Sequence, residues 1–226
     1  MLTKAYKKAI RAIGRGNEKE GFLLMQEAAK ADDPIAWCAL GTAYAYGLGT
    51  SVNHRLAAGF YKKAANAGDI DAKYNLAAAY AEGNGVRRNY TQTLLLLRDP
   101  VKKKMPEAVH LLGQLYRFGN GVKQSLKTGF RLELRAARAG LPDAMFSVGY
   151  CYSRGEGVKS NDKTALSWYL KAAKGGHPEA AYNAGFFFEN GIGTNKKFQD
   201  ARRWYKVAAK LGDVDAKARL RRLRTT

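Results

Sequence analysis

The sequence has few of the residues that build covalent or metal-bound frameworks. Its 226 residues include only two cysteines, Cys38 and Cys151, which lie far apart and form no CxxC pair. This excludes a disulfide framework and a zinc site with ordinary ligand spacing, so we expect both cysteines to be buried small apolar residues. The three histidines, His54, His110 and His177, form neither a metal-binding pair on one helix nor a nucleophile–base–acid set. We therefore expect no metal ion, no cofactor and no enzyme activity.

Long hydrophobic runs are also missing. No segment approaches the roughly 20 apolar residues that a membrane-spanning helix needs. The basic, amphipathic start of the chain (residues 1–17) lacks the apolar stretch and the small-residue cleavage site of a secretory signal. Because 46% of the residues are nevertheless hydrophobic, the chain has ample material for a core. We expect a soluble, cytoplasmic protein.

Acidic residues are scarce, because the chain has 19 Asp and Glu residues but 39 Lys and Arg residues, which gives a net charge of +20. A field of this sign attracts acidic proteins, nucleic acids and anionic membrane surfaces. No nucleic-acid-binding motif accompanies the charge. The positive charge is spread along the chain, and it is densest in residues 98–104, 131–138, 196–206 and 217–224.

What the sequence does contain is a repeat of 36 residues without insertions. It is marked by six alanines, Ala36, Ala72, Ala108, Ala144, Ala180 and Ala216. Four and five residues after the first five alanines comes an apolar–small pair such as Leu40-Gly41, and an aromatic residue such as Tyr44 follows three positions later. This is the spacing of one helix face, on which the small residue lets a neighbouring helix approach closely. We call this first helix of each repeat helix A.

Turn and capping residues predict where the helices begin and end. Helix A begins with proline in four units, and Asp69 or Asp213 can cap it in the other two. A glycine suited to the left-handed conformation ends helix A in a GxG turn. A second helix, helix B, then begins at a good N-cap in four repeats, with Lys197 as the exception. The sequence therefore predicts an all-α fold of antiparallel helix pairs. The expected N-caps are Asn53, Asn89, Ser125 and Asn161.

The combined pattern, A-xxx-LG-xx-Y-xx-G-x-G-V followed by A-xx-WY-xx-AA-xx-G, resembles the Sel-one-like repeat family, which is related to the tetratricopeptide repeats. The resemblance implies a right-handed α-solenoid, a superhelix with the A helices on its concave side, and an adaptor role in bacterial signalling, secretion or host contact. We expect one solenoid domain over residues 1–226. Its parts are a divergent N-terminal helix pair (1–35), five repeats (36–71, 72–107, 108–143, 144–179 and 180–215) and a C-terminal capping helix (216–226).

One segment departs from the pattern. Residues 94–106 place Pro100 where the other repeats have alanine and Lys104 where they have glycine. Because proline disfavours helical conformation in the residue before it, we expect helix B of this repeat to end near Asp99. Two interpretations stay open: a tolerated shorter helix, or a hinge or contact loop that carries Lys102, Lys103 and Lys104.

The resemblance also implies which side chains face the groove. If helix A corresponds to its tetratricopeptide counterpart, the groove-facing positions are those of residues 38, 39, 42, 45 and 46 in each repeat. Aromatic and amide side chains alternate there. The candidate partner-binding residues are Tyr74, Asn75, His110, Gln114, Arg117, Phe146, Tyr150, Arg154, Tyr182, Asn183 and Phe186. Alternatively, the residues at position 38 of each repeat pack between successive A helices as core.

These residues predict a non-catalytic adaptor or scaffold, a monomer that binds an acidic protein or an extended peptide in the concave groove. The asparagines would bond the peptide backbone, the rings would pack its side chains, and Arg117 and Arg154 would pair with its carboxylates. The alternative is binding of nucleic acid or an anionic surface through the basic exterior.

Overall fold

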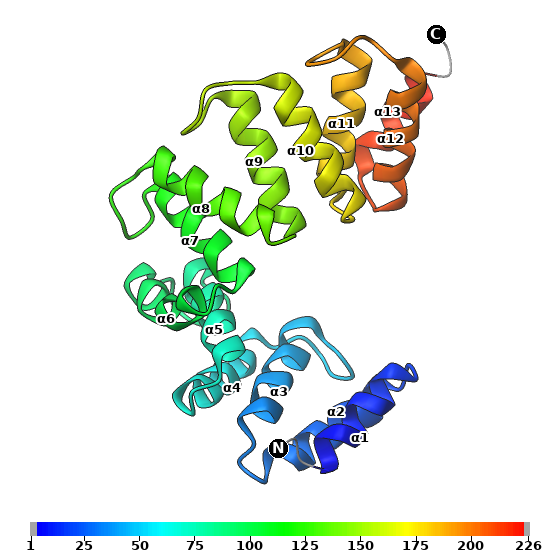
Figure 1. The fold of residues 1–226 in the computed structure, drawn as a ribbon. Coiled ribbons are helices and arrows are strands. Elements are labelled where there is room, and N and C mark those ends of the chain that lie inside the picture. Colours follow the sequence, from blue (N-terminus) through cyan, green and yellow to red (C-terminus); the bar gives the residue numbers. More distant parts are fainter. Residues whose placement is uncertain (1–3, 224–226) are drawn as a thin grey trace. The chain divides into compact units, whose positions relative to one another are not determined.

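In the computed structural model, which describes residues 4–223, the chain is a succession of antiparallel helix pairs (Figure 1). No strand occurs in this range, which confirms the all-α solenoid class. Nor is any helix within it long and apolar enough to cross a membrane. The A helices are α1 (Lys4–Gly14), α3 (Pro34–Tyr46), α5 (Ile70–Glu82), α7 (Pro106–Phe118), α9 (Pro142–Arg154) and α11 (Pro178–Asn190). The B helices are α2 (Glu18–Ala29), α4 (His54–Asn66), α6 (Tyr90–Lys102), α8 (Leu126–Arg138), α10 (Asp162–Lys174) and α12 (Phe198–Lys210), and α13 (Val214–Arg222) follows them.

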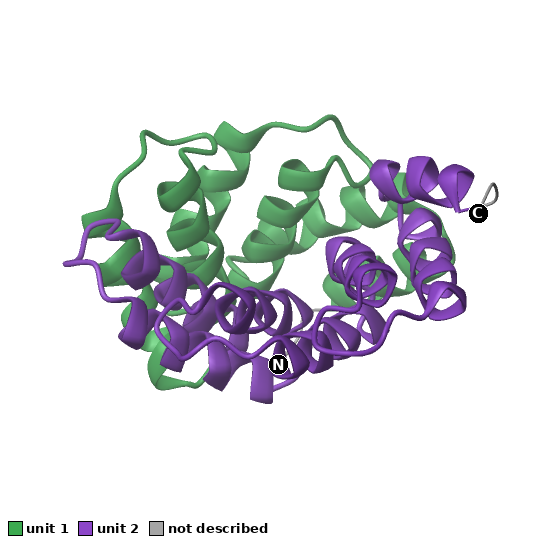
Figure 2. Ribbon diagram, turned by 90° about the horizontal axis from the view of Figure 1, so that it is seen from above, with its two compact units in different colours: residues 1–104 green, residues 105–226 purple. Residues whose placement is uncertain are grey.

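The chain divides into two compact units, drawn in green and purple in Figure 2. Unit 1 (Met1–Lys104) contains α1 to α6, and unit 2 (Met105–Thr226) contains α7 to α13. The organisation as one domain stays a prediction. So does the capping role of residues 216–226, of which 224–226 lie outside the described residues.

The predicted helix boundaries are confirmed at both ends of the repeat units. Proline is the first residue of α3, α7, α9 and α11, and the Asp69 and Asp213 side chains cap α5 and α13. Each middle A helix ends at a left-handed glycine with φ between 71° and 84°. The predicted side-chain caps form on α4, α6, α8 and α10, whereas Lys197 makes none on α12.

The second glycine of the turn has its own structural role. A Cβ atom on Gly85 would lie 2.0 Å from the backbone oxygen of His54, the first residue of the preceding B helix, and one on Gly157 would lie 2.2 Å from that of Leu126. Both glycines also have a positive φ. The turn therefore packs directly on the backbone of the previous repeat, which only glycine permits.

Within each repeat, the small residue of helix A faces a large side chain of helix B. A Cβ on Gly149 would lie 2.8 Å from the ring of Tyr169, and a Cβ on Gly185 would lie 2.8 Å from that of Tyr205. In the second repeat the small residue is Ala77, and Leu97 replaces the tyrosine. The close approach expected from the glycines is thus an approach of helices A and B of the same repeat.

The prediction that helix B of the second repeat ends near Asp99 is wrong, because α6 continues to Lys102. Pro100 removes one backbone hydrogen bond, but the Lys103 N–H still donates to the Asp99 carbonyl oxygen at 2.9 Å. The proline ring is fully buried, as are the alanines at its position in other repeats, and this burial offsets the lost bond. Lys104 adopts φ 61°, the left-handed conformation that Gly140 supplies in the next repeat.

Candidate functional site

The predicted partner-binding residues lie on A helices of both units. Tyr74 and Asn75 lie on α5 of unit 1, and the other nine lie on α7, α9 and α11 of unit 2. Arg154 is exposed and the remaining ten are half-buried. Half-burial is typical of side chains that pack between neighbouring helices and still present an edge to a ligand.

The structure brings three predicted residues of unit 2 together around one ring. The guanidinium carbon of Arg117 lies 5.3 Å from the centroid of the Tyr150 ring, and that of Arg154 lies 5.9 Å from it. Arg117 also lies 4.7 Å from the ring centroid of the exposed Phe118. Glu156 holds Arg117 from one side, with 3.7 Å between its Oε2 and the arginine Nε. These contacts form an arginine–aromatic cluster at the C-terminal ends of α7 and α9.

Phe146 and Tyr182, the aromatic residues at position 38 of the last two repeats, pack against side chains of their own helix pair and against the next helix or its N-cap. Phe146 stacks on the His177 ring with centroids 4.4 Å apart. Tyr182 lies against Tyr205 with centroids 5.3 Å apart, and its hydroxyl oxygen accepts a hydrogen bond from Arg219 Nε at 3.3 Å. These side chains contribute to the core and keep part of their surface in solvent.

The other candidates of unit 2 are less directly connected. Asn183 is a hydrogen-bond partner of the Tyr169 side chain, and Phe186 lies 5.7 Å from the guanidinium carbon of Arg219. Gln114 is half-buried on α7. These three residues border the core of unit 2 and make no shared cluster with Tyr150 in the described contacts.

In unit 1, the Asn75 side chain is oriented by a cysteine. Its Nδ2 lies 3.7 Å from Cys38 Sγ, a weak acceptor. Tyr74 and Asn75 both line a pocket of about 260 Å³, whose other walls include Tyr46, Tyr61 and Glu82. The two predicted residues of this unit therefore share one concave surface.

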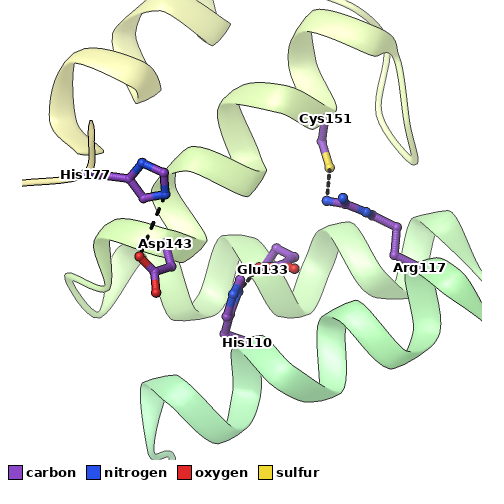
Figure 3. Close-up of polar contacts among 6 residues, drawn as sticks. All are labelled: His110, Arg117, Glu133, Asp143, Cys151 and His177. Atoms are coloured by element: carbon purple, nitrogen blue, oxygen red, sulfur yellow. Dashed lines mark hydrogen bonds and ion pairs between the residues drawn. The ribbon is translucent and has the colours of Figure 1, made fainter. Parts of the chain in front are cut away.

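Unit 2 also contains a buried ionisable pair, shown in Figure 3. Glu133 of α8 is fully buried, and one of its carboxylate oxygens contacts Nδ1 of His110 on α7. Its other oxygen has no hydrogen-bond partner among residues 4–223. Burial raises the pKa of the Glu133 carboxyl, and His110 and Arg117 reduce that rise. His110, a predicted groove residue, thus shields the carboxylate from the surface.

A buried thiol lies close to Arg117 in the same unit. Cys151 is fully buried, and burial raises the pKa of its thiol to about 11 although Arg117 Nη1 lies 4.0 Å from the sulfur. A thiol of that pKa is protonated and unreactive at neutral pH. In the part of the chain that the structure describes, no group of three His, Cys, Asp or Glu side chains is placed to hold a metal ion.

Comparison with known proteins identifies the repeat. A model of the Sel1 repeat matches residues 6–33, 35–69, 70–98, 106–141, 142–177 and 178–213. The chain belongs to the Sel1 repeat family. The first of these segments includes the N-terminal pair that the sequence alone marks as divergent. No curated protein sequence matches the chain.

Solved structures carry the same fold. A Sel1 repeat protein from Oxalobacter formigenes is 27% identical, with a TM-score of 0.81 over 93% of this chain and 86% of that one. A protective antigen of uropathogenic Escherichia coli is 23% identical, with a TM-score of 0.72 over 97% of this chain and 48% of the antigen. An immunity protein from Pseudomonas aeruginosa is 19% identical, with a TM-score of 0.67 over 96% and 85% of the two chains.

The third full repeat differs from the other repeats of this chain at three positions. Glu133 replaces the buried tyrosine of three other repeats, Gly129 replaces an alanine or threonine, and Arg117 stands where the first two have alanine. A Cβ on Gly129 would lie 2.9 Å from the Gly113 carbonyl oxygen and 3.1 Å from Arg117 Cβ, so the glycine lets α7 and α8 approach closely. Glu133 was not among the residues predicted from the sequence, although the loss of the repeated tyrosine at this position could have indicated it.

Charge in this Sel1 repeat protein is divided between the two helix types. The A helices α3, α5, α7, α9 and α11 carry three basic and six acidic residues. The B helices α4, α6, α8, α10 and α12 carry sixteen basic and four acidic residues. The positive charge of the repeats therefore resides mainly on the B helices, whose net charge is +12, whereas the A helices together have a net charge of −3.

Proposed function

We propose that this Sel1 repeat protein is a non-catalytic adaptor that binds an extended acidic segment of a protein partner on the A-helix side of unit 2. Family membership supports a protein-binding scaffold. The arginine–aromatic cluster supports the choice of ligand, because two guanidinium groups lie within 6 Å of one tyrosine ring. Guanidinium groups bind carboxylates with two parallel hydrogen bonds, and the ring offers an apolar surface to the residue beside the carboxylate.

The neighbouring half-buried residues would complete the contact. We propose that Asn183 and Gln114 bond the peptide backbone, and that Phe186 packs against its side chains. Asn75 and Tyr74 would act in the same way in unit 1. The sixteen basic residues of the B helices would raise the rate of encounter with an acidic partner without contacting the bound segment.

The experiment compares two sets of variants against a partner captured from the native organism. Tyr150→Ala and Arg154→Ala remove contact area and a charged donor, and each is expected to weaken binding by about 1 to 3 kcal/mol, mainly through faster dissociation. Arg138→Ala, an exposed arginine on the B helix α8, is the matched control and should leave dissociation unchanged. Asn75→Ala, Asn183→Ala and Arg117→Ala extend the map.

The second set reverses charge outside the groove. Changing Lys196, Lys197, Arg202 and Arg203 to glutamate is expected to slow association and flatten its salt dependence, with dissociation unaltered. Surface plasmon resonance separates the two rates. If the A-helix variants bind normally and the charge reversals abolish binding, the groove is not the site.

The charge on the B helices favours one alternative, the binding of nucleic acid or another anionic surface. Contacts to phosphates release counterions, so such binding weakens steeply with salt. Purified protein would then carry nucleic acid, visible as excess absorbance at 260 nm that disappears in high salt. A clean spectrum at low salt favours the protein partner.

We further propose that the protein acts as a monomer in the cytoplasm. Cys38 and Cys151 are free, buried thiols, which suits a reducing compartment. The +20 charge opposes self-association at moderate ionic strength. Sedimentation velocity measures the oligomeric state directly.

A further inference from the structure

A second pocket of unit 1, with a volume of about 410 Å³, lies among α1, α2, α3 and α5. Apolar side chains form much of its wall, namely Ile13, Phe22, Met25, Ile35 and Leu48. Its polar lining includes Tyr6, Asn75 and three carboxylates, Glu18, Asp69 and Asp71. We call this site the acidic pocket.

The three carboxylates of the acidic pocket are not neutralised by the protein itself. Within residues 4–223 none of them forms an ion pair. Asp69 Oδ1 accepts the Ala72 N–H at 2.7 Å as the cap of α5, and the Asp69 carboxylate is also a hydrogen-bond partner of the Cys38 thiol.

Asp33 adds a fourth charge nearby. It is 8% exposed, and its Oδ2 has no hydrogen-bond partner in the described part of the chain. Asp33 and Asp69 cap the N-terminal ends of α3 and α5, and Asp71 lies in the first turn of α5, so negative charge gathers at this end of the pocket in a chain of net charge +20. Glu18 lies at the opposite end of α3, where its backbone oxygen packs on Gly49.

Two titratable groups inside the pocket respond to this charge. Burial is the main cause of the raised pKa of Tyr6, and Asp33, Asp69 and Asp71 raise it further. Burial and the Asp69 carboxylate raise the pKa of Cys38 to about 12. Burial, the larger cause at both places, disfavours charge of either sign. The smaller effect of the neighbouring aspartates disfavours negative charge and would favour a positive charge that pairs with them.

We propose that the acidic pocket binds an arginine or lysine side chain presented by an extended segment of a protein partner. These side chains combine a long aliphatic stem with a cationic end, and the pocket combines apolar walls with unpaired carboxylates. The stem packs on the apolar wall, which includes Ile13, Phe22 and Met25, and the cation pairs with Asp69 and Asp71. Asn75 lies beside them and bonds the backbone of the same segment.

This assignment goes beyond the proposed function, because the preferred charge is opposite to that of the arginine–aromatic cluster in unit 2. A partner that uses both units presents a basic residue to one and an acidic residue to the other. The occupant is a partner and not a second copy of this chain, because two copies of net charge +20 repel each other.

The test uses the full chain and three fluorescein-labelled peptides that differ at one residue, with the sequence Gly-Ser-Leu-X-Leu-Ser-Gly. X is arginine, its neutral isostere citrulline, or glutamate. Fluorescence anisotropy should show binding of the arginine peptide, about tenfold or more weaker binding of the citrulline peptide, and no binding of the glutamate peptide. Added salt should reduce the affinity for the arginine peptide and leave that for citrulline nearly constant.

The variant E18Q/D69N/D71N removes the three charges with little change of shape, and asparagine at position 69 retains the helix cap. It is expected to bind the arginine peptide about tenfold or more weakly while its melting temperature stays near that of the wild type. The control D213N/D215N changes the same repeat positions at α13 and should bind as the wild type does. Ala39→Leu, which fills part of the pocket wall, should weaken both the arginine and the citrulline peptides.

Several results would overturn the proposal. These are equal affinities for arginine and citrulline, no binding of the arginine peptide at about millimolar concentration, or unchanged binding by E18Q/D69N/D71N. Concentration-dependent dimerisation that the same variant abolishes would make a second copy the occupant, and the assignment to a partner would fail. None of these results bears on Tyr150 and Arg154, whose variants test unit 2 separately.

Discussion

Replacing Gly149 by alanine tests how helices A and B pack within one repeat. The new Cβ would lie 2.8 Å from Cδ1 and Cε1 of Tyr169 and 3.3 Å from the Ala165 carbonyl oxygen. Carbon atoms in ordinary contact are about 3.5 to 4.0 Å apart, so the ring or the helix α10 must move by more than about half an ångström. The Tyr169 ring is itself held by Phe146 and Phe187, with centroids 5.8 and 5.4 Å away, which restricts that movement.

Two opposing effects set the size of the change. Overpacking a core of this kind costs about 1 to 3 kcal/mol, and exchanging glycine for alanine inside a helix contributes about 1 kcal/mol of stability. We expect a net loss of about 1 kcal/mol for Gly149→Ala. In a chain of this length that corresponds to a melting temperature lower by about 2 to 4 °C.

A second substitution, Tyr169→Leu, should change the effect of Gly149→Ala on stability from a loss to a gain. The repeat that contains Ala77 has Leu97 at the position of Tyr61, Tyr169 and Tyr205, and the Ala77 and Leu97 side chains are buried. In a Tyr169→Leu background the collision disappears, so Gly149→Ala should stabilise the protein by about 1 kcal/mol. Gly59→Ala is the control, because Gly59 lies inside α4 with no atom within 4 Å of its added Cβ, and it should stabilise in any background.

Thermal and urea unfolding followed by far-ultraviolet circular dichroism measure all four proteins of the cycle and the control. If Gly149→Ala stabilises the wild type as much as Gly59→Ala does, the tyrosine ring does not limit the helix approach and the packing argument fails. A loss of equal size in both backgrounds would also contradict it, because the cost would then come from another neighbour.

Three further predictions concern the N-cap of α12, the pH dependence of stability and the metal independence of the fold. Lys197 occupies the N-cap position of α12, but its side chain makes no capping hydrogen bond. At the same position of α10, Asn161 Oδ1 accepts the Thr164 N–H at 2.9 Å. Lys197→Asn should therefore raise the free energy of unfolding by about 1 kcal/mol and increase the melting temperature. Burial raises the pKa of Glu133, so its contribution to stability is full below the unfolded pKa of about 4.3 and is lost as the pH rises toward the folded value. Glu133→Gln should therefore stabilise by an amount that grows over this pH range, and a gap in melting temperature that narrows with rising pH would contradict the assignment. Finally, the far-ultraviolet circular dichroism spectrum should be strongly helical in the presence of a metal chelator, because apolar packing and turns specify every repeat, and appreciable strand content would refute this.

The sequence by itself determined the fold, because the signals that specify it are local and repeat every 36 residues. Proline at a helix start, asparagine at an N-cap and glycine at a C-cap act within one turn of the backbone, so their spacing could be read directly. The same locality explains the failure at Pro100. Whether a proline ends a helix or only weakens its last turn depends on what its ring packs against, and that packing is tertiary.

Only the tertiary structure decided how side chains of different helices combine. The contact of His110 with Glu133 and the arrangement of Arg117 and Arg154 around Tyr150 join residues of different helices, and no spacing in the sequence fixes such distances. The acidic pocket depends on tertiary structure in the same way. Asp69 and Asp71 are read in the sequence as a cap and a helix-dipole partner, and they gain a second role because α1, α2 and α3 place apolar walls beside them. The physical reason is that caps and turns depend on neighbours along the chain, whereas a binding site depends on neighbours in space.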